Sequence, residues 1–224
     1  MIETIAIVPA AGLGKRLGLK KKKPFVLLKG RPLIAYALKA LDSSKFIDSI
    51  IVACEAGSIG RLKGVIKKYG FKKITKIVKG GKTRFGSVRN CFNAIASPCD
   101  IVLIHDGARP FPEERMIRDS VMLAEKFGAC ITALPSTDTI KLSGHDNFIE
   151  KTLDRKKLWK AQTPQAFRYG MLKKAIDGVK YTVDITDDAC IFERAGEKVK
   201  ILEGSARNIK ITTKEDLVFA EALI

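Results

Sequence analysis

The stretch AIVPAAGLGKRLGLKKKKPF, residues 6–25, passes from apolar residues through glycines into a run of basic side chains. The apolar residues Ile5–Val8 predict a short buried strand. Gly12 and Gly14 carry no side chain, so backbone N–H groups after this strand can approach a ligand closely. The crowded positive charges repel one another, which costs folding free energy unless the loop is merely solvated or holds an anion. The stretch therefore predicts a strand followed by an anion-binding loop, with a solvated lysine run as the alternative.

Beyond this stretch, apolar strand patterns alternate with amphipathic helix patterns. Extended segments are predicted at residues 50–53, 74–78, 101–105, 130–134, 158–162 and 199–202. Helices are predicted at residues 32–41, 59–69, 84–95, 113–127, 169–177, 187–195 and 214–223. Continuous apolar strands between amphipathic helices are typical of a sheet covered on both faces. The predicted fold class is α/β, with a Rossmann-like, mostly parallel twisted sheet and helices on both faces.

The alternation breaks at about Ser136. The sequence TIKLSGHDNFIEKTL, residues 139–153, reads as two short extended segments around Ser143-Gly144, which predicts a β-hairpin arm. Such an arm has little core of its own, so a partner subunit is expected to cover it. We predict a single domain over residues 1–224, in which residues 136–157 form a homodimerisation arm.

Composition limits the class of protein. The chain has 224 residues, 46% of them hydrophobic, and a formal net charge of +17. No apolar run approaches the ~18 residues of a membrane span, and the N-terminus shows no leader pattern, so we expect a cytoplasmic protein without a membrane partner. The charge predicts attraction to polyanions. Basic stripes with interleaved aromatics are missing, which argues against nucleic acid as the partner.

Cysteine and histidine usage restricts the metal chemistry. The five cysteines form no CxxC pair, and the chain has two histidines. This pattern argues against a disulfide framework or a zinc site and favours a reducing compartment. Any metal is then expected to be a hard ion held by oxygen ligands.

Two other phosphate-binding loops resemble parts of the sequence. A dinucleotide fingerprint GxGxxG requires glycine where Leu17 stands, together with an acidic residue about 20 positions later that is not found. A P-loop requires GxxxxGK[ST]; Gly81-Lys82-Thr83 supplies its end, but Lys76 occupies the first glycine position. Both alternatives match only in part.

The segment VPAAGLGKRLG followed by KKPF resembles the nucleotidyltransferase loop of the sugar-nucleotide pyrophosphorylases. Further segments narrow the resemblance: HDGARPF (105–111), DTIK (138–141), DRKKLWKAQTPQAF (154–167), ITDDA (185–189) and ARNIKIT (206–212). In this order and spacing, the set resembles the 2-C-methyl-D-erythritol 4-phosphate cytidylyltransferase family over essentially the whole chain. The resemblance implies a Mg²⁺-dependent homodimeric enzyme that transfers the cytidylyl group of CTP to 2-C-methyl-D-erythritol 4-phosphate in non-mevalonate isoprenoid biosynthesis.

The resemblance also implies roles for individual residues. Arg16, Lys23 and Lys210 would be the catalytic cations around the reacting phosphates. The residues that would contact CTP are Ala10, Ala11, Gly12, Gly14, Gly81, Ser87 and Asp106. The residues that would contact the acceptor are Asp106, Arg109, Thr139, Arg155, Thr163 and Thr186, with Arg155 serving the neighbouring subunit.

Several of these positions have a second interpretation. Asp106 follows a strand at the sheet edge where α/β proteins bind ligands, so it can hold Mg²⁺ or a hydroxyl, or simply cap a loop. Lys210 can also be an exposed strand residue, and Lys20–Lys22 are expected to face solvent. His105 is expected to be a packed residue at a strand end rather than a base, and Trp159 and Phe167 are interpreted as packing residues.

Lys82 departs from some members of the family, which have an acidic residue at this position. If a carboxylate reads the base in those members, backbone groups must do so here. Two other functions remain open. The related ribitol-5-phosphate cytidylyltransferases share the glycine loop and the TPQ segment, although DRKKLW and ITDDA favour the erythritol enzyme. A non-catalytic polyanion-binding protein would also account for the net charge of +17.

Overall fold

The computed structural model describes residues 2–12, 14, 22–179 and 185–224. Its centre is a seven-stranded sheet with the order β11-β7-β10-β6-β1-β4-β5. The strands of this sheet are β1 (Thr4–Pro9), β4 (Ser49–Cys54), β5 (Ile74–Lys79), β6 (Ile101–Ile104), β7 (Ala129–Pro135), β10 (Trp159–Arg168) and β11 (Lys200–Glu203). The helices are α1 (Leu33–Ser43), α2 (Ile59–Tyr69), α3 (Arg84–Asn93), α4 (Glu114–Phe127), α5 (Tyr169–Gly178), α6 (Ala189–Arg194) and α7 (Lys214–Ala222).

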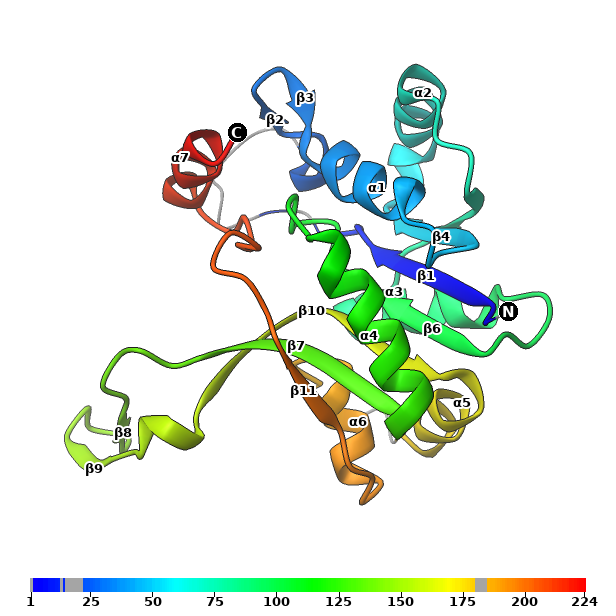
Figure 1. Cartoon of the computed structure of the whole chain (residues 1–224). Helices are drawn as coiled ribbons and strands as arrows, with labels where there is room; N and C mark the ends of the chain where they lie inside the picture. The colour runs from blue at the N-terminus through cyan, green and yellow to red at the C-terminus, as the bar shows by residue number, and fades with distance from the viewer. Residues whose placement is uncertain (1, 13, 15–21, 180–184) are drawn as a thin grey trace.

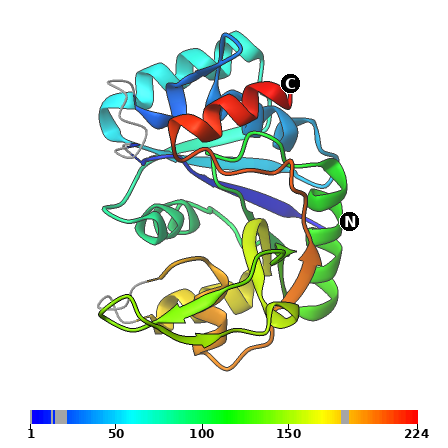
Figure 2. The same cartoon turned by 90° about the vertical axis from the view of Figure 1, so that its left-hand side faces the viewer.

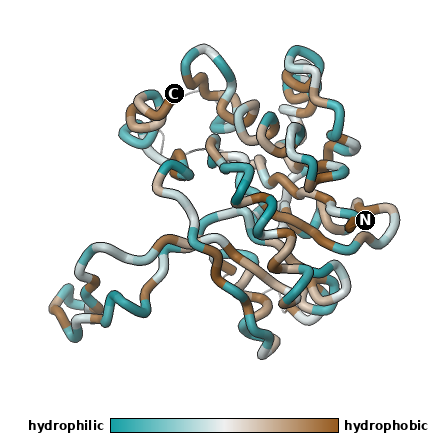
Figure 3. The backbone as a smooth tube through the Cα atoms, viewed as in Figure 1, coloured by the Kyte–Doolittle hydropathy of each residue, from teal (hydrophilic) through white to brown (hydrophobic). Residues whose placement is uncertain are grey.

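The strand β1 explains why the sheet is covered on both faces. Ala6 and Val8 belong to one buried cluster, whereas Ile5 and Ile7 belong to another. Side chains alternate between the two faces of a strand, so an uninterrupted apolar run requires apolar partners on each side. Figure 3 shows apolar segments running through the middle of the molecule, where these strands lie.

The two clusters assign every helix named above except α7 to a face of the sheet. Buried side chains of α1, α2 and α4 join the cluster of Ala6 and Val8, and those of α3, α5 and α6 join the cluster of Ile5 and Ile7. Figures 1 and 2 show the sheet between these two groups of helices. The predicted α/β fold, mostly parallel and helix-covered, is confirmed.

The strand β10 was predicted too short. It continues through Arg168 and pairs antiparallel with both β6 and β7. Polar residues such as Gln162 and Gln165 interrupt the apolar pattern that would have marked its second half, yet both are buried because they bond to neighbouring loops. Phe167 packs in the core. Trp159, which was also interpreted as a packing residue, is 40% exposed in one chain.

Two small sheets lie outside the central one. The first pairs β2 (Leu27–Leu28) with β3 (Arg31–Pro32), next to the short helix η2 (Lys23–Phe25). The second pairs β8 (Lys141–Ser143) antiparallel with β9 (Ile149–Thr152), and Figure 1 shows this hairpin well away from the central sheet. The segment around Lys210 forms no strand. Among the helices that the structure describes, none has the length and apolar content to cross a membrane.

Candidate active site

A pocket of about 690 Å³ opens at the carboxyl edge of the parallel strands. Four strands that are neighbours in the sheet, β6, β1, β4 and β5, end here, and the loops that follow them form the walls. Ligands bind at this edge in open α/β sheets. The lining residues are Pro9, Ala10, Ala11, Gly12, Gly14, Lys23, Pro24, Glu55, Ala56, Lys79, Gly80, Gly81, Lys82, Thr83, Arg84, Ser87, Asp106, Gly107, Ala108 and Lys210.

Glycines let the walls of this pocket approach one another. A Cβ atom on Gly80 would lie 2.1 Å from the Ala11 side chain, and one on Gly81 would lie 2.5 Å from the backbone of Gly86. Such contacts are too short for any side chain, so the loop after β5 reaches its position only with glycine there. Gly14, in the loop after β1, adopts a φ of 69°, which also favours glycine.

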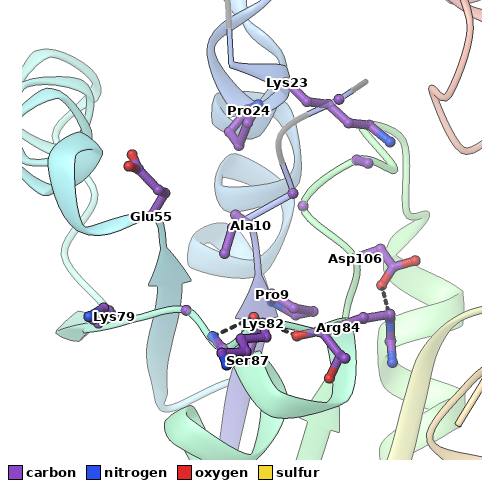
Figure 4. Close-up of a pocket in the computed structure, with 18 of the residues that line it drawn as sticks. Pro9, Ala10, Lys23, Pro24, Glu55, Lys79, Lys82, Arg84, Ser87 and Asp106 are labelled. Atoms are coloured by element: carbon purple, nitrogen blue, oxygen red, sulfur yellow. Dashed lines mark hydrogen bonds and ion pairs between the residues drawn. The ribbon is translucent and has the colours of Figure 1, made fainter. Parts of the chain in front are cut away.

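The helix α3 begins at the pocket. The Thr83 hydroxyl caps it by accepting a hydrogen bond from the Gly86 N–H at 2.9 Å. The Ser87 hydroxyl accepts a bond from the Gly81 N–H at 3.1 Å and donates to the Thr83 carbonyl. These bonds fix the Gly81 turn against the first turn of the helix, which makes one rigid wall (Figure 4).

Asp106 is the centre of an ion-pair network beside this wall. Its Oδ1 accepts a bond from Arg84 Nε at 2.7 Å, shown in Figure 4, and its Oδ2 lies 2.7 Å from Lys210 Nζ. Arg109 Nε lies 4.0 Å from the same Oδ2. Arg84 also pairs with Asp188 at 2.7 Å. The carboxylate of Asp106 thus faces three cations, two of which line the pocket.

The pKa values follow from this arrangement. Burial alone would raise the pKa of Asp106, but Arg84 and Lys210 outweigh it and hold that pKa well below its usual range. Burial also raises the pKa of Asp188, which Arg84 offsets in part. Burial would lower the pKa of Arg84, and the two carboxylates reverse that effect. The network therefore keeps Asp106 ionised at neutral pH.

A second set of bonds fixes the backbone of Asp106. Its N–H donates to the Thr163 hydroxyl at 3.0 Å, and that hydroxyl also bonds to His105 Nδ1 at 3.1 Å. His105 Nε2 lies 3.0 Å from the Arg109 carbonyl. Burial lowers the pKa of His105 to about 4, so the ring is neutral. The prediction that His105 packs in the core is confirmed.

The opposite wall carries a second ion pair. Glu55, directly after β4, pairs with Lys22 and accepts a bond from the Ser58 hydroxyl. Figure 4 shows Glu55 and Asp106 on opposite sides of the pocket. Lys23, the residue after Lys22, lies near the top of the pocket in this view. Lys22 was expected to face solvent; its side chain is 41% exposed and also pairs with Glu55. The same expectation for Lys20 and Lys21 lies outside the described residues.

The structure brings together most of the predicted nucleotide-side residues. Those that line the pocket are Ala10, Ala11, Gly12, Gly14, Lys23, Gly81, Ser87, Asp106 and Lys210. Arg16 lies outside the described residues. Lys82 also lines the pocket, beside Gly81.

The predicted acceptor residues other than Asp106 do not line this pocket within one chain. Thr163 is buried behind Asp106, as described above. Arg109 is also buried, and it donates to the carbonyls of Asn208 and Ala161 at 2.8 and 3.3 Å. Thr139 and Thr186 are exposed. Arg155 is exposed at the base of the hairpin and donates to the Thr137 carbonyl at 2.7 Å.

Sequence reasoning missed Arg84 and Glu55. Glu55 follows β4 just as Asp106 follows β6, so its position at a strand end was a usable signal. Arg84 follows the Gly81-Lys82-Thr83 segment, which the sequence presents only as a partial P-loop. Its pairing with Asp188, 104 positions away, leaves no local pattern.

The lining residues would suit a Mg²⁺ ion shared with substrate phosphates rather than one held by protein side chains alone. Among the described residues, no group of three or more His, Cys, Asp or Glu side chains could hold a metal. Magnesium is usually held through one or two carboxylates together with substrate phosphates. Asp106 supplies one ionised carboxylate, which suits that donor set.

The chain is similar to proteins of one known family along nearly its whole length. The family model IspD, 2-C-methyl-D-erythritol 4-phosphate cytidylyltransferase, matches residues 4–224. Proteins of that name from Clostridium acetobutylicum and Alkaliphilus oremlandii are 43% and 42% identical, over 98% and 99% of this chain and 96% and 95% of theirs. A crystal structure of 4-diphosphocytidyl-2C-methyl-D-erythritol synthase from Anaerococcus prevotii has a TM-score of 0.88 at 33% identity, covering 99% of this chain and 95% of that one. The chain belongs to the 2-C-methyl-D-erythritol 4-phosphate cytidylyltransferase family.

Proposed function

We propose that the pocket transfers the cytidylyl group of CTP to 2-C-methyl-D-erythritol 4-phosphate. A phosphate oxygen of the acceptor attacks the α-phosphorus of CTP, and the bond from that phosphorus to the bridging oxygen of the β-phosphate breaks. The products are 4-diphosphocytidyl-2-C-methyl-D-erythritol, an isoprenoid precursor, and pyrophosphate. The observation that carries this proposal is the family match over residues 4–224.

The nucleotide would lie between the loop after β1 and the wall formed by Gly81 and α3. Ala10, Ala11, Gly12 and Gly14 offer backbone groups without bulky side chains, which suits close approach to a triphosphate. Gly81 and Ser87 form a rigid surface for the base. Because Lys82 offers no acceptor there, backbone carbonyls must accept from the amino group of cytosine.

Lys23 and Lys210 would stabilise the transition state, together with Arg16. The acceptor phosphate is already ionised near neutral pH, so the reaction needs positioning and charge stabilisation more than a general base. Lys210 is well placed because its ammonium group lines the pocket while Asp106 fixes it at 2.7 Å. Cations in fixed positions stabilise charge without reorganising during the reaction.

The acceptor would bind beside Asp106. Arg109 and Thr163 fix the Asp106 segment from behind, and Thr186 would approach from the loop before α6. Arg155 and Thr139 lie near the hairpin, so they would reach the site of a neighbouring subunit. Arginine suits this task because its fork binds phosphate through two donors.

Asp106 and the CTP phosphates would hold Mg²⁺. The ion would neutralise phosphate charge and orient the triphosphate. The protein residues would keep the acceptor and the α-phosphorus aligned and exclude water from between them.

We also propose that the enzyme is a homodimer in the cytoplasm. The hairpin of residues 136–157 exposes Leu142, Phe148 and Ile149, with 78% of Phe148 accessible. Apolar side chains on a segment without its own core favour a protein partner. The five cysteines are all free, which agrees with a reducing compartment.

Selectivity for the acceptor tests the function directly. Purified protein is incubated with CTP, Mg²⁺ and either 2-C-methyl-D-erythritol 4-phosphate or D-ribitol 5-phosphate, and pyrophosphate release is followed. We expect release with the erythritol phosphate only. Release with ribitol phosphate alone, or silence with both when the protein is folded and dimeric, would contradict the proposal.

A further inference from the structure

Arg84 joins two carboxylates that belong to distant parts of the chain. Its Nε donates to Asp106 Oδ1, and its Nη2 donates to Asp188 Oδ2, both at 2.7 Å. Asp106 follows β6, and Asp188 directly precedes α6. One planar guanidinium at the start of α3 therefore connects three separate elements at the edge of the pocket.

Asp188 is held rigidly on its own side. Its side chain is 0% exposed, and its N–H donates to Gln165 Oε1 of β10 at 3.0 Å. Gln165 Nε2 also donates to Asp187 Oδ2 at 3.0 Å. Within the described residues, Asp188 Oδ1 has no hydrogen-bond partner. Arg84 is thus the group that compensates this buried carboxylate.

We propose that Arg84 is a positioning residue for the transfer reaction. It holds Asp106, on the nucleotide side, and the segment 185–188, which carries Thr186 on the acceptor side, in one fixed arrangement. Both substrates are then presented in a single geometry before they react. This inference rests on the proposed function.

The fork of the guanidinium is essential to this role. Arginine presents several donors in a planar arrangement, whereas lysine offers a single flexible ammonium group. A lysine at position 84 would keep the positive charge but could not bridge two carboxylates in the same geometry. Small displacements of reacting groups can lower a rate about 100-fold.

A purely structural role makes a different prediction. If Arg84 only neutralises buried charge, removing both the charge of Arg84 and that of Asp188 should restore stability and turnover together. A buried charge left without its partner is strongly destabilising, whereas replacing both partners is often tolerated. A double variant therefore separates the two roles.

The experiment compares Arg84→Gln, Arg84→Lys, Asp188→Asn and the double variant Arg84→Gln/Asp188→Asn. We expect Arg84→Gln to lower the melting temperature by about 6–15 °C and kcat by at least about tenfold. The double variant should recover most of the melting temperature while kcat stays low. Arg84→Lys should also lower kcat, with KM for both substrates changed less than about threefold, because positioning acts on the transition state.

The exposed pair Arg118 and Asp119, 2.6 Å apart on α4, is the matched control. Arg118→Gln/Asp119→Asn should leave kcat and the melting temperature unchanged. Recovery of kcat together with stability in the double variant, full kcat in Arg84→Lys, or an effect on KM alone would each overturn the proposal. If Arg84→Gln does not fold, Arg84→Lys and the double variant decide the question. A wild-type enzyme without turnover would instead overturn the proposed function.

Discussion

At the scale of single residues, the proposed chemistry depends on cations whose positions are fixed by ion pairs in the pocket. Lys210 is the clearest case, because Asp106 both holds it and is itself held by Arg84 and by the backbone bond to Thr163. The carboxylate does not need to donate or accept a proton. It stays ionised and keeps the positive charge directed at the pocket.

Lys210→Ala is expected to lower kcat by about 100-fold or more, because a preorganised charge at the reacting phosphate is lost. Steady-state measurement of pyrophosphate release gives the value. Lys173→Ala is the control, since Lys173 pairs with Asp177 on the exposed surface of α5. A variant at position 210 that keeps its rate within threefold of wild type would refute the catalytic role of this lysine.

His105 gives a prediction for stability against pH. Its pKa is about 4 in the folded chain and about 6.5 when unfolded. The unfolded state therefore binds the proton more tightly, so this residue contributes stability above pH 6.5 that is lost as the pH falls towards 4. The loss amounts to about 3 kcal/mol.

Urea unfolding at pH 7 and pH 4.5 measures this contribution. Between pH 7 and pH 4.5, the free energy of unfolding should fall less in His105→Gln than in wild type. The carboxylates still titrate in the variant, but the contribution of His105 to the pH dependence is gone. The exposed His145 serves as control, and His145→Gln should retain the wild-type dependence. Equal pH dependence in wild type and His105→Gln would contradict the buried neutral ring.

At the scale of elements, the Gly81 turn and α3 together form the proposed nucleotide-binding wall. A Cβ on Gly81 would lie 2.5 Å from the backbone of Gly86, so Gly81→Ala must move the turn away from the helix. We expect KM for CTP to rise about tenfold, as overpacking costs 1–3 kcal/mol. Calorimetric titration with CTP provides an independent measurement.

Gly64→Ala is the control for Gly81→Ala, because it makes the same substitution at a glycine away from the pocket. Gly64 lies inside α2 with nothing within 4 Å of the added Cβ. Alanine there should stabilise the fold by about 0.5–1 kcal/mol and leave CTP binding unchanged. Similar CTP binding in both variants would show that the Gly81 contact does not shape the site.

Local patterns in the sequence predict the elements well where each pattern is self-contained. The helix α2 ends at Tyr69, as predicted, because Gly70 supplies the left-handed residue, with a φ of 65°, that stops it. The strand β1 and the loop after it are also predicted, since an uninterrupted apolar run and glycines carry their own signal. The roles expected of the nucleotide-side residues come from the family resemblance, whereas these elements explain why most of those residues line one pocket.

The remaining features depend on contacts between distant segments. The antiparallel placement of β10 between β6 and β7 is decided by the whole sheet, and its buried glutamines are stabilised by loops from elsewhere in the chain. The bridge from Arg84 to Asp188 spans 104 positions. Thr139 and Arg155, which are proposed as acceptor contacts, lie outside the pocket of one chain, so the fold of a single chain does not bring them to it.

At the scale of the whole molecule, the hairpin should make the site dependent on assembly. Phe148 is the most exposed apolar side chain of the hairpin, 78% accessible in one chain. A charge at this position, in Phe148→Asp, should convert a dimer into monomers with reduced turnover. Light scattering coupled to size-exclusion chromatography measures the molecular mass of the protein in solution. Phe219→Asp, at an exposed apolar position on α7, is the control and should remain dimeric. A wild-type monomer with full activity would disprove the dimer.

The direction of attack is the most direct test of the central claim. The enzyme is supplied with CTP, Mg²⁺ and 2-C-methyl-D-erythritol 4-phosphate whose terminal phosphate oxygens carry ¹⁸O, and the products are resolved by ³¹P nuclear magnetic resonance. Attack by the acceptor phosphate on the α-phosphorus predicts that all label remains in the diphosphocytidyl product and none enters pyrophosphate. Label in pyrophosphate, or no new diphosphate at all, would contradict the account.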